Sequence, residues 1–590
     1  MKKLIKVLMK RWWLVLLVWI AIIIQCFLQL QLPDRMNAIQ SIITKIPQPD
    51  DAINQIWVQG GWMLLLSLGV FILASIQNFF GTYLSAHVAQ DLREEMFKKV
   101  NSLSLTDYSK FGTASLITRT TNDITQIEMI IAMGLQLMIK APIMAVWAIL
   151  KILNKSWQWS AMTGVAVLIL LSVIGLLILI VLPRFKKVQK AIDRINEVTR
   201  ENLTGIRVVR AFNAEKYQED KFEEINTKLT NLQLFNQKSF AVMQPTMYLI
   251  MHTLTLGIYF LGSYLIMNAG MADKITLFGD MIVFSSYAMQ VIMSILMLAM
   301  IFMMLPRASV SANRINEVLD TNTSIKDGTL NESKTNEIGT VEFKNVSFKY
   351  PDAKEYLLEN ISFKVNKGDT VAFIGSTGSG KSTLINLVPR FYDVTEGEVL
   401  VDGTNVKEYK LEALYNKLGY IPQRAVMFDG TVNENVAFGE NGKEKTTKEK
   451  IKEAIQIAQG KDFVENMDEK YDSHIAQGGT NISGGQKQRL AIARAIARNP
   501  EIYIFDDSFS ALDYKTDSIL RKELKKHTKN ATSLIVAQRI GTIMNADKII
   551  VLDSGKVVGE GTHKELLKNC EVYKQIALSQ LSKEELEDAE

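Results

Sequence analysis

Residues 503–508 read YIFDDS, a short apolar stretch that ends on two adjacent carboxylates, Asp506 and Asp507. The apolar part is typical of a buried strand, and ligands of α/β folds bind beyond the carboxyl ends of such strands. We therefore expect Asp506 to hold a magnesium ion there, because carboxylate oxygens are ligands that Mg²⁺ accepts. Asp507, one position further on, is expected to lie beside the same ligand.

A glycine-rich loop upstream complements these carboxylates. Residues 375–382 read GSTGSGKS, after an apolar stretch and before an expected helix that begins near Thr383. A strand, a glycine loop and a helix in this order form a P-loop, whose backbone N–H groups surround phosphates. Lys381 is then expected to reach the β and γ phosphate oxygens, and Ser382 to hold magnesium together with Asp506. The module therefore predicts ATP and Mg²⁺ as ligands.

The composition indicates a second and much more apolar region. The chain has 590 residues, 48% of them hydrophobic, which is too long for one domain and too apolar for a typical soluble protein. Its net charge of +5 gives no support to nucleic-acid binding. Cys26 and Cys570 make neither a disulfide framework nor a metal site. At least two regions of different character are expected.

Apolar runs in the first half predict six membrane-spanning helices. The basic residues among positions 1–12 place the N-terminus inside the cell, and six crossings return the chain there. The charged, helical stretch after Pro183 is expected to extend into the cytoplasm. The expected spans are 14–32, 62–83, 129–153, 159–182, 240–267 and 281–305. The sequence thus predicts an α-helical six-span transmembrane domain with long cytosolic helical extensions, in the lipid bilayer of the cell membrane.

A third motif narrows the class of protein. Residues 482–486 read ISGGQ and precede the helical stretch KQRLAIARAIARNP. With the glycine loop, this motif and the acidic strand end in this order, the whole chain resembles an ATP-binding cassette (ABC) exporter. The expected organisation is a transmembrane domain at 1–319, a polar linker at 320–340, an α/β P-loop nucleotide-binding domain at 341–575 and a solvated acidic tail at 576–590.

The resemblance also assigns roles to individual residues. It implies that Tyr350 stacks on adenine, although a buried strand aromatic is the alternative, and that segments near 112–123 and 211–215 are coupling helices. The residues implied to bind ATP are Tyr350, Gly375, Ser376, Thr377, Gly378, Ser379, Gly380, Lys381, Ser382, Thr383 and Gln423, with Ser382, Gln423 and Asp506 at the metal. The signature is Ser483, Gly484, Gly485 and Gln486, and the D-loop is Ser510, Ala511, Leu512 and Asp513.

In similar proteins two nucleotide-binding domains close head to tail, so that each ATP lies between the Walker A loop of one and the signature of the other. Ser483 and the N–H groups of Gly484 and Gly485 begin a helix, and the positive end of a helix suits a γ-phosphate presented by a partner. The chain is therefore expected to act together with a second half-transporter.

Two positions depart from the family pattern. Family members that hydrolyse ATP quickly carry Glu after the Walker B Asp and His in the switch loop, whereas this chain has Asp507 and Gln538. The shorter Asp507 carboxylate is drawn back from an attacking water, and a displacement of about 1 Å can cost ~10²-fold in rate. Lys381, Ser382 and Asp506 are unaffected, so we expect a degenerate site that binds ATP and hydrolyses it slowly.

Two features of the spans are candidates for a substrate path. Lys140 lies inside the third expected span, where a charge is a functional candidate, although we favour snorkelling of its side chain to the inner interface. Five methionines of the sixth span share one helix face. They are Met289, Met293, Met297, Met300 and Met304. Methionine surfaces adapt to varied apolar ligands, but helix packing or lipid contact explains this stripe equally well.

Together these features favour one half of a heterodimeric exporter of hydrophobic or amphipathic compounds, with multidrug efflux as the expected role. Its partner would carry the consensus Glu and His. A homodimeric lipid or peptide exporter is the first alternative. A membrane sensor or regulator that responds to ATP occupancy is the second.

Overall fold

The computed structural model describes residues 2–45, 49–153, 155–351, 353–439 and 446–581. These residues form two compact units. The first comprises the chain up to residue 101 together with 114–321, and the second comprises 102–113 together with the chain from residue 322 onward. The final residues of the expected acidic tail, 582–590, lie outside the described part of the chain.

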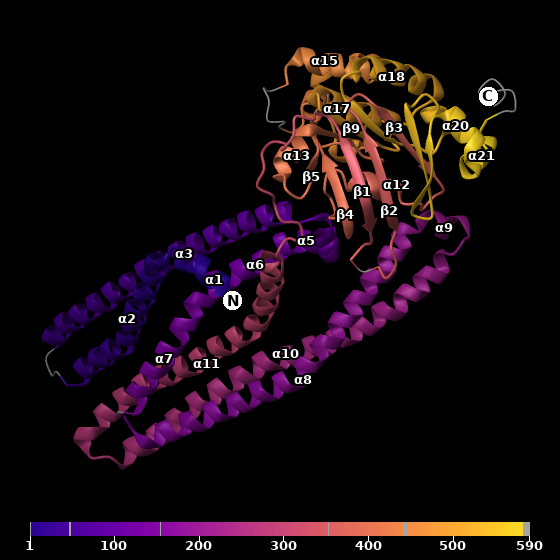
Figure 1. Cartoon of the computed structure of the whole chain (residues 1–590). Coiled ribbons are helices and arrows are strands. Elements are labelled where there is room, and N and C mark those ends of the chain that lie inside the picture. Colours follow the sequence, from indigo (N-terminus) through magenta and orange to yellow (C-terminus); the bar gives the residue numbers. More distant parts are fainter. Residues whose placement is uncertain (1, 46–48, 154, 352, 440–445, 582–590) are drawn as a thin grey trace. The chain divides into compact units, whose positions relative to one another are not determined.

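The first unit is entirely helical (Figure 1). Its helices are α1 (Lys2–Met9), α2 (Trp12–Lys45), α3 (Pro49–Ser102), α5 (Thr113–Thr120), α6 (Asn122–Met129), the π-helix η1 (Ile130–Gly134), α7 (Leu135–Leu153), α8 (Trp157–Thr204), α9 (Ile206–Ala211), α10 (Glu215–Asn268) and α11 (Met271–Asp320). Among the described residues, six stretches are long and apolar enough to cross a membrane: 12–43, 50–102, 113–153, 157–181, 215–268 and 273–301. The prediction of six spans is confirmed, since each expected span overlaps one of these stretches.

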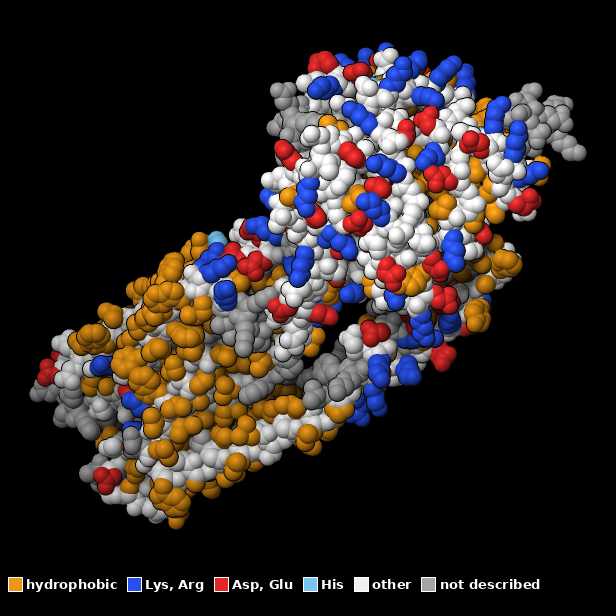
Figure 2. Space-filling view, viewed as in Figure 1, with side chains coloured by type: hydrophobic (Ala, Val, Ile, Leu, Met, Phe, Trp, Pro, Cys, Tyr) orange, Lys and Arg blue, Asp and Glu red, His pale blue; other side chains and the backbone are white. Residues whose placement is uncertain are grey.

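Four of these helices, α3, α8, α10 and α11, are far longer than a bilayer is thick. Helices α8 and α10 contain 48 and 54 residues and pack side by side. At about 1.5 Å per residue, each exceeds the ~30 Å hydrocarbon thickness by more than twofold. This is the helical extension that the charged stretch after Pro183 predicts. Figure 2 shows hydrophobic side chains gathered over the long helices of the first unit, with charged side chains spread over the second.

The helices of the first unit enclose an apolar core with a polar anchor. Trp159, Phe284 and Tyr287 are fully buried in this core. The Tyr287 hydroxyl group donates to the Leu30 carbonyl oxygen at 2.8 Å and contacts Asp34 at 2.9 Å. These bonds join α11 to α2 and satisfy a polar group that would be costly to bury alone.

Short helices interrupt the long ones near both expected coupling segments. Helix α5 begins directly after Gly112, whose φ of +72° ends the preceding helix α4 (Leu105–Phe111). The second short helix is α9, which ends where the expected segment 211–215 begins. Residues 212 and 213 form a turn there, with Asn213 at a φ of +49°. The expected segment 211–215 thus spans the end of α9, this turn and the first residue of α10.

The second unit contains the α/β module. A four-stranded antiparallel sheet has the order β2-β1-β4-β5, and a six-stranded sheet has the order β12-β11-β3-β10-β9-β6. The strands are β1 (Val341–Phe348), β2 (Leu358–Val365), β3 (Thr370–Gly375), β4 (Glu396–Val401), β5 (Thr404–Asn405), β6 (Leu418–Ile421), β7 (Gly430–Thr431), β8 (His474–Ile475), β9 (Ile502–Asp506), β10 (Thr532–Val536), β11 (Lys548–Asp553) and β12 (Lys556–Gly561).

Helices cover these sheets. They are α12 (Lys381–Asn386), α13 (Leu411–Lys417), α14 (Val432–Val436), α15 (Lys448–Ile457), α16 (Lys461–Glu465), α17 (Gly484–Arg498), α18 (Tyr514–His527), α19 (Ile540–Ile543), α20 (His563–Asn569) and α21 (Glu571–Leu578), with the 3-10 turns η2 (Lys470–Asp472) and η3 (Gln477–Gly479). Strands β6, β9, β10 and β3 run parallel, so their carboxyl ends meet at one edge of the sheet. The predicted architecture, a six-span helical unit fused to an α/β unit, is thus confirmed.

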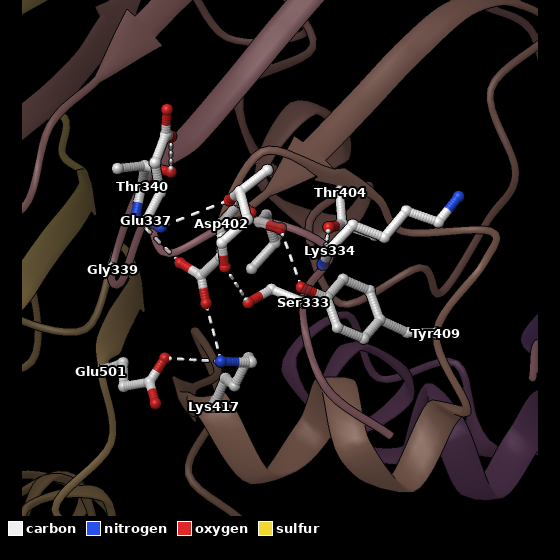
Figure 3. A network of polar contacts seen from close by, with 12 residues as sticks. Ser333, Lys334, Glu337, Gly339, Thr340, Asp402, Thr404, Tyr409, Lys417 and Glu501 are labelled. Atoms are coloured by element: carbon white, nitrogen blue, oxygen red, sulfur yellow. Dashed lines mark hydrogen bonds and ion pairs between the residues drawn. The ribbon is translucent and has the colours of Figure 1, made fainter. Parts of the chain in front are cut away.

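The polar stretch before β1 is fixed to the second unit by a hydrogen-bond network (Figure 3). The Thr335 hydroxyl group donates to the Asp402 carbonyl oxygen at 2.7 Å, and the Thr340 N–H donates to the Asp402 carboxylate at 3.1 Å. Lys417 donates to the same carboxylate at 2.7 Å and to Glu501 at 2.9 Å. Asp402 is fully buried, so a paired charge holds this part of the expected linker in place.

Candidate nucleotide site and transmembrane cavity

The glycine-rich loop connects β3 to α12 through a tight turn. A Cβ atom on Gly375 would lie 1.9 Å from the Leu552 carbonyl oxygen, which no side chain tolerates. Gly380 has a φ of +93°, and a Cβ there would meet the Leu358 side chain at 2.7 Å. Both positions therefore require glycine, and a loop so shaped is the backbone cradle that phosphate groups bind.

The Lys381 side chain folds back into this loop. Its Nζ donates to the carbonyl oxygens of Gly375 at 2.9 Å and Ser376 at 2.7 Å, and to the Ser379 hydroxyl at 3.3 Å. Burial lowers the pKa of Lys381, and the nearby carboxylates of Asp507 and Asp506 oppose that shift. A partly buried ammonium group beside a phosphate cradle is placed to neutralise phosphate charge.

Ser382 and Asp506 lie together as the sequence predicts. The Ser382 hydroxyl donates to the Asp506 carboxylate at 2.7 Å, because α12 begins beside the carboxyl end of β9. Burial raises the pKa of Asp506, while the Ser382 hydrogen bond opposes the shift. One hydroxyl and one carboxylate oxygen are a donor set that fits Mg²⁺, which accepts few protein ligands besides nucleotide phosphates and water.

The neighbouring Asp507 carboxylate is held by two glutamine side chains. Gln538 Nε2 donates to Asp507 Oδ2 at 2.8 Å, and Gln423 Nε2 donates to the same oxygen at 3.2 Å. The backbone of Asp507 is left-handed, with a φ of +47°, and its N–H donates to the Val536 carbonyl oxygen at 3.0 Å. Burial raises the pKa of Asp507, and these side-chain hydrogen bonds oppose the shift.

This convergence on one carboxylate oxygen cannot be read from the sequence. Gln423 follows β6, Asp507 follows β9 and Gln538 follows β10, so three separate strand ends supply it. The sequence predicts Gln423 as a magnesium ligand, whereas the structure places its amide nitrogen on Asp507. The sequence indicates that each of the three residues follows a strand, whereas only the structure shows that these strands are neighbours.

Tyr350 lies in a cluster of aromatic rings. Its ring centre is 5.0 Å from that of Phe348 and 5.3 Å from that of Tyr392, and both pairs have edge-to-face geometry. Its hydroxyl group lies 3.0 Å from the Thr383 hydroxyl, next to the start of α12. The side chain is half-buried, and its contact with adenine stays a prediction.

The signature residues begin α17 in a reciprocal capping arrangement. The Gln486 N–H donates to the Ser483 hydroxyl at 3.3 Å, and the Ser483 N–H donates to the Gln486 side chain at 2.8 Å. A Cβ atom on Gly484 would meet nothing within 4 Å, whereas one on Gly485 would lie 3.3 Å from the Ala511 carbonyl oxygen. One side of the helix start is thus open, and the other packs on the D-loop.

The D-loop joins the signature region to the acidic strand end. The Ser510 hydroxyl donates to the Asp507 carbonyl oxygen at 2.9 Å, Leu512 is buried, and Asp513 caps α18 by accepting from the Thr516 N–H at 2.9 Å. Within the described residues, no hydrogen bond links 483–486 to the glycine loop 375–382. The structure therefore brings the loop, Asp506, Asp507, Gln423 and Gln538 into one cluster and leaves the signature apart.

The switch loop is also attached to the turn that follows α21. Gln580 Nε2 donates to the Gln538 carbonyl oxygen at 2.8 Å, and Gln580 Oε1 accepts from the Ile540 N–H at 2.8 Å. Nothing in the sequence pattern indicates this contact, because Gln580 follows the nucleotide motifs by many residues and matches none of them.

A separate cavity of about 650 Å³ lies among the long helices of the first unit. It is lined by Lys140 from α7 and by Met289, Met293 and Met297 from α11, so the structure brings together four of the predicted substrate-path residues. Met300 and Met304 are outside it. The sequence favours snorkelling of the Lys140 side chain to the inner interface. Snorkelling alone does not explain why Lys140 lines the same cavity as the methionines.

The chain matches two family descriptions. Residues 4–295 match the description "ABC transporter transmembrane region", and residues 358–510 match the description "ABC transporter". An uncharacterized ABC transporter ATP-binding protein of Mycobacterium tuberculosis (strain H37Rv) is 39% identical over 525 residues, with 89% of each chain covered. The chain belongs to the ABC transporter family, and its six spans fused to the ATPase domain make it an ABC exporter.

Two further relatives have functional names. A Bacillus subtilis protein provisionally named as a multidrug export ATP-binding/permease protein is 31% identical, with 85% of each chain covered. The ATP-dependent lipid A-core flippase of Pseudomonas aeruginosa is 31% identical and covers 83% of this chain and 79% of its own. A bacterial Atm1-family ABC exporter with ATP bound has the same fold, with a TM-score of 0.80, 23% identity, and coverage of 96% and 98% of the two chains.

Proposed function

We propose that this chain is one half of a heterodimeric ABC exporter and carries its degenerate ATP site. The observation that carries the proposal is the contact between Asp507 and Gln538, 2.8 Å apart, at the two positions where fast family members have Glu and His. The proposed organisation keeps the transmembrane domain at 1–319, the linker at 320–340 and the nucleotide-binding domain at 341–575.

The geometry around Asp507 supports slow hydrolysis. Its side chain is buried and is shorter than that of glutamate by one methylene group. Its carboxylate already accepts hydrogen bonds from two amide nitrogens. A general base must lie within hydrogen-bond reach of the water that it activates. Gln538 offers an amide donor in place of an imidazole, so it cannot exchange a proton near neutral pH as histidine can.

Nucleotide binding should nevertheless persist. The loop shape, the buried Lys381 ammonium and the Ser382–Asp506 pair do not depend on Asp507 or Gln538. We expect this site to hold Mg-ATP through Tyr350, the loop residues and Gln423 while turning it over slowly. The open side of Gly484 supports the second role of the chain, in which Ser483–Gln486 complete the partner's catalytic site.

The proposed cargo is a hydrophobic or amphipathic compound. The cavity lined by Met289, Met293 and Met297 supports this, because unbranched thioether side chains adapt to ligands of varied shape. The name of the Bacillus subtilis relative is consistent with multidrug efflux. We place the protein in the cell membrane, with both termini and the nucleotide-binding domain in the cytoplasm.

A second candidate is a homodimeric lipid exporter. It is favoured by the similarity to the Pseudomonas lipid A-core flippase. In that case both ATP sites would be identical and slow, and the chain purified alone would show substrate-dependent turnover.

One comparison of ATPase rates separates these candidates. The chain is co-expressed with its partner subunit, and Asp507→Asn in this chain is compared with the matching Glu→Gln change in the partner. The proposal expects only the partner's change to abolish turnover. If Asp507→Asn is equally damaging, Asp507 is a working base and the symmetric exporter is the better account.

A further inference from the structure

The transmembrane cavity combines two kinds of surface along α11. Met289, Met293 and Met297 follow one another at intervals of four residues and form a soft apolar stripe. Ser286, Gln290 and Ser294 repeat at the same interval one position further on and form a polar stripe beside it. Residues four apart lie on the same helix face, so both stripes face the cavity together. The wall therefore suits a molecule with an apolar part and a polar part.

The charge of this cavity is positive. Lys140 is the one charged side chain among its described lining residues, which also include Gln29, Thr255 and Tyr259. Within the described part of the chain, Lys140 makes no ion pair, whereas the nearby membrane lysines Lys151 and Lys155 are bonded to Asp34 and Asp280. The cationic group that faces the cavity is thus available to a ligand.

The polar stripe supplies a second, independent observation. Gln290 Oε1 is buried and has no hydrogen-bond partner among the described residues. A buried amide oxygen without a partner is costly, so the polar stripe is not fully satisfied by the described residues of the chain. The cavity thus presents a cation and an adaptable apolar stripe beside a polar stripe.

We propose that the cargo bound in this cavity is an acidic amphiphile, with its anionic group on Lys140 and its apolar chain along the methionine stripe. This rests on the proposed export function and names its substrate class. An unpaired cation in a low-dielectric wall attracts anions strongly and repels cationic compounds. The chain should therefore prefer carboxylate, phosphate or sulfonate amphiphiles to the organic cations that many efflux proteins carry.

The test measures binding in the absence of ATP hydrolysis. The full-length chain is placed in nanodiscs of phosphatidylcholine, and fluorescence titration compares dansyl-labelled undecanoate, its primary amide and the matching undecylamine. We expect the acid to bind roughly 10- to 100-fold more tightly than the amide, as a charge-assisted contact allows. Lys140→Gln should remove this preference, Lys140→Arg should keep it, and Lys190→Gln on the exposed part of α8 should leave it unchanged.

The apolar half of the proposal has its own matched pair. Met293→Ser should weaken the acid and the amide by the same several-fold factor, because both lose the same apolar contact. Met300→Ser, on the same helix but outside the cavity, should leave the binding of both the acid and the amide unchanged. Retained amide binding in the Lys140 variants shows that these variants are folded.

Three results would overturn the inference: equal binding of acid and amide, a preference for the acid that survives Lys140→Gln, or tighter binding of the amine. The source of the acidic group is distinguished by adding phosphatidylglycerol to the discs. Competition with the probe identifies a membrane lipid as the cargo, and its absence identifies a soluble acidic amphiphile. Failure of the export function would appear instead as absence of ATP-driven transport, so the two failures are distinguishable.

Discussion

Lengthening the Asp507 side chain should convert the slow site into a faster one. In Asp507→Glu the carboxylate extends further by one carbon–carbon bond, about 1.5 Å. A misplacement of about 1 Å can cost ~10²-fold in rate, so restoring the reach of the carboxylate should lower the activation free energy of hydrolysis by up to about 2.7 kcal/mol. Asp507 and Gln538 share a hydrogen bond of 2.8 Å, so the full gain should need Gln538→His as well.

The assay isolates this one site. The partner's catalytic Glu is replaced by Gln, so that the remaining ATP turnover of the co-expressed complex arises at Asp507. We expect Asp507→Glu to raise turnover, the double variant to raise it up to about 10²-fold, and Gln538→His alone to do little. The left-handed backbone at φ +47° tolerates Asp better than Glu, so a loss of up to about 1 kcal/mol in stability should accompany the gain.

Two outcomes would refute this reasoning. If the double variant binds ATP but turns over at the original rate, the reach of the carboxylate does not limit hydrolysis. If Asp507→Glu lowers turnover and Asp507→Asn abolishes it, aspartate is the working base. Thermal unfolding checks folding, since 1 kcal/mol corresponds to about 2–4 °C for a domain of this size.

Four further predictions follow from the second unit. The added Cβ atom of Gly484→Ala would meet nothing within 4 Å, so thermal stability and ATP binding should stay intact. Turnover at the partner's site should fall about 10-fold or more, and unchanged turnover would contradict the role in trans. Because burial raises the pKa of Asp506, Mg²⁺-dependent ATP binding should weaken on acidification at a higher pH than that at which an exposed aspartate titrates. A flat pH profile would argue against Asp506 as metal ligand. In the wild type the Ser324 N–H donates to the Asp107 carboxylate at 2.8 Å, and Asp107→Ala removes this acceptor. Hydrogen exchange of the Ser324 amide should become about 10- to 100-fold faster in the variant. Unchanged protection of this amide would contradict the prediction. Burial acts to raise the pKa of Asp107, but the hydrogen bonds that its carboxylate accepts outweigh burial, and the pKa is lowered. In the wild type, protection of the Ser324 amide should therefore hold at neutral pH. It should be lost only as the pH falls below the ordinary carboxyl range, through the lowered pKa of Asp107.

The nucleotide motifs could be predicted because their chemistry is local. The glycine loop requires small residues where β3 turns into α12, and the clash of a Cβ at Gly375 with Leu552 confirms the physical reason. The Ser382–Asp506 pair follows from a strand end beside a loop. The number of spans could be predicted because membrane thickness sets the length of an apolar run.

Contacts that depend on packing between distant segments were not accessible in this way. The order of the parallel strands decides that Gln423 meets Asp507, and no spacing in the sequence fixes that order. In the same way, the spacing of the methionines predicts that they share one face of a helix but not which helix packs against that face. Only the packing of α7 against α11 shows that Lys140 shares a cavity with Met293, while Met300 lies beyond it.

The attachment of Gln580 to the switch loop has a practical consequence. Any movement of Gln538 must either carry Gln580 with it or break the hydrogen bond between them, at a cost of about 0.5–1.5 kcal/mol, and movement of Ile540 breaks the second bond to Gln580. A fluorophore attached at the neighbouring, exposed Ser579 would leave the Gln580 side chain in place and would therefore respond to rearrangement of the switch loop from outside the nucleotide cluster. A deletion that removes Gln580 would loosen the same loop without altering any residue of the ATP-binding motifs.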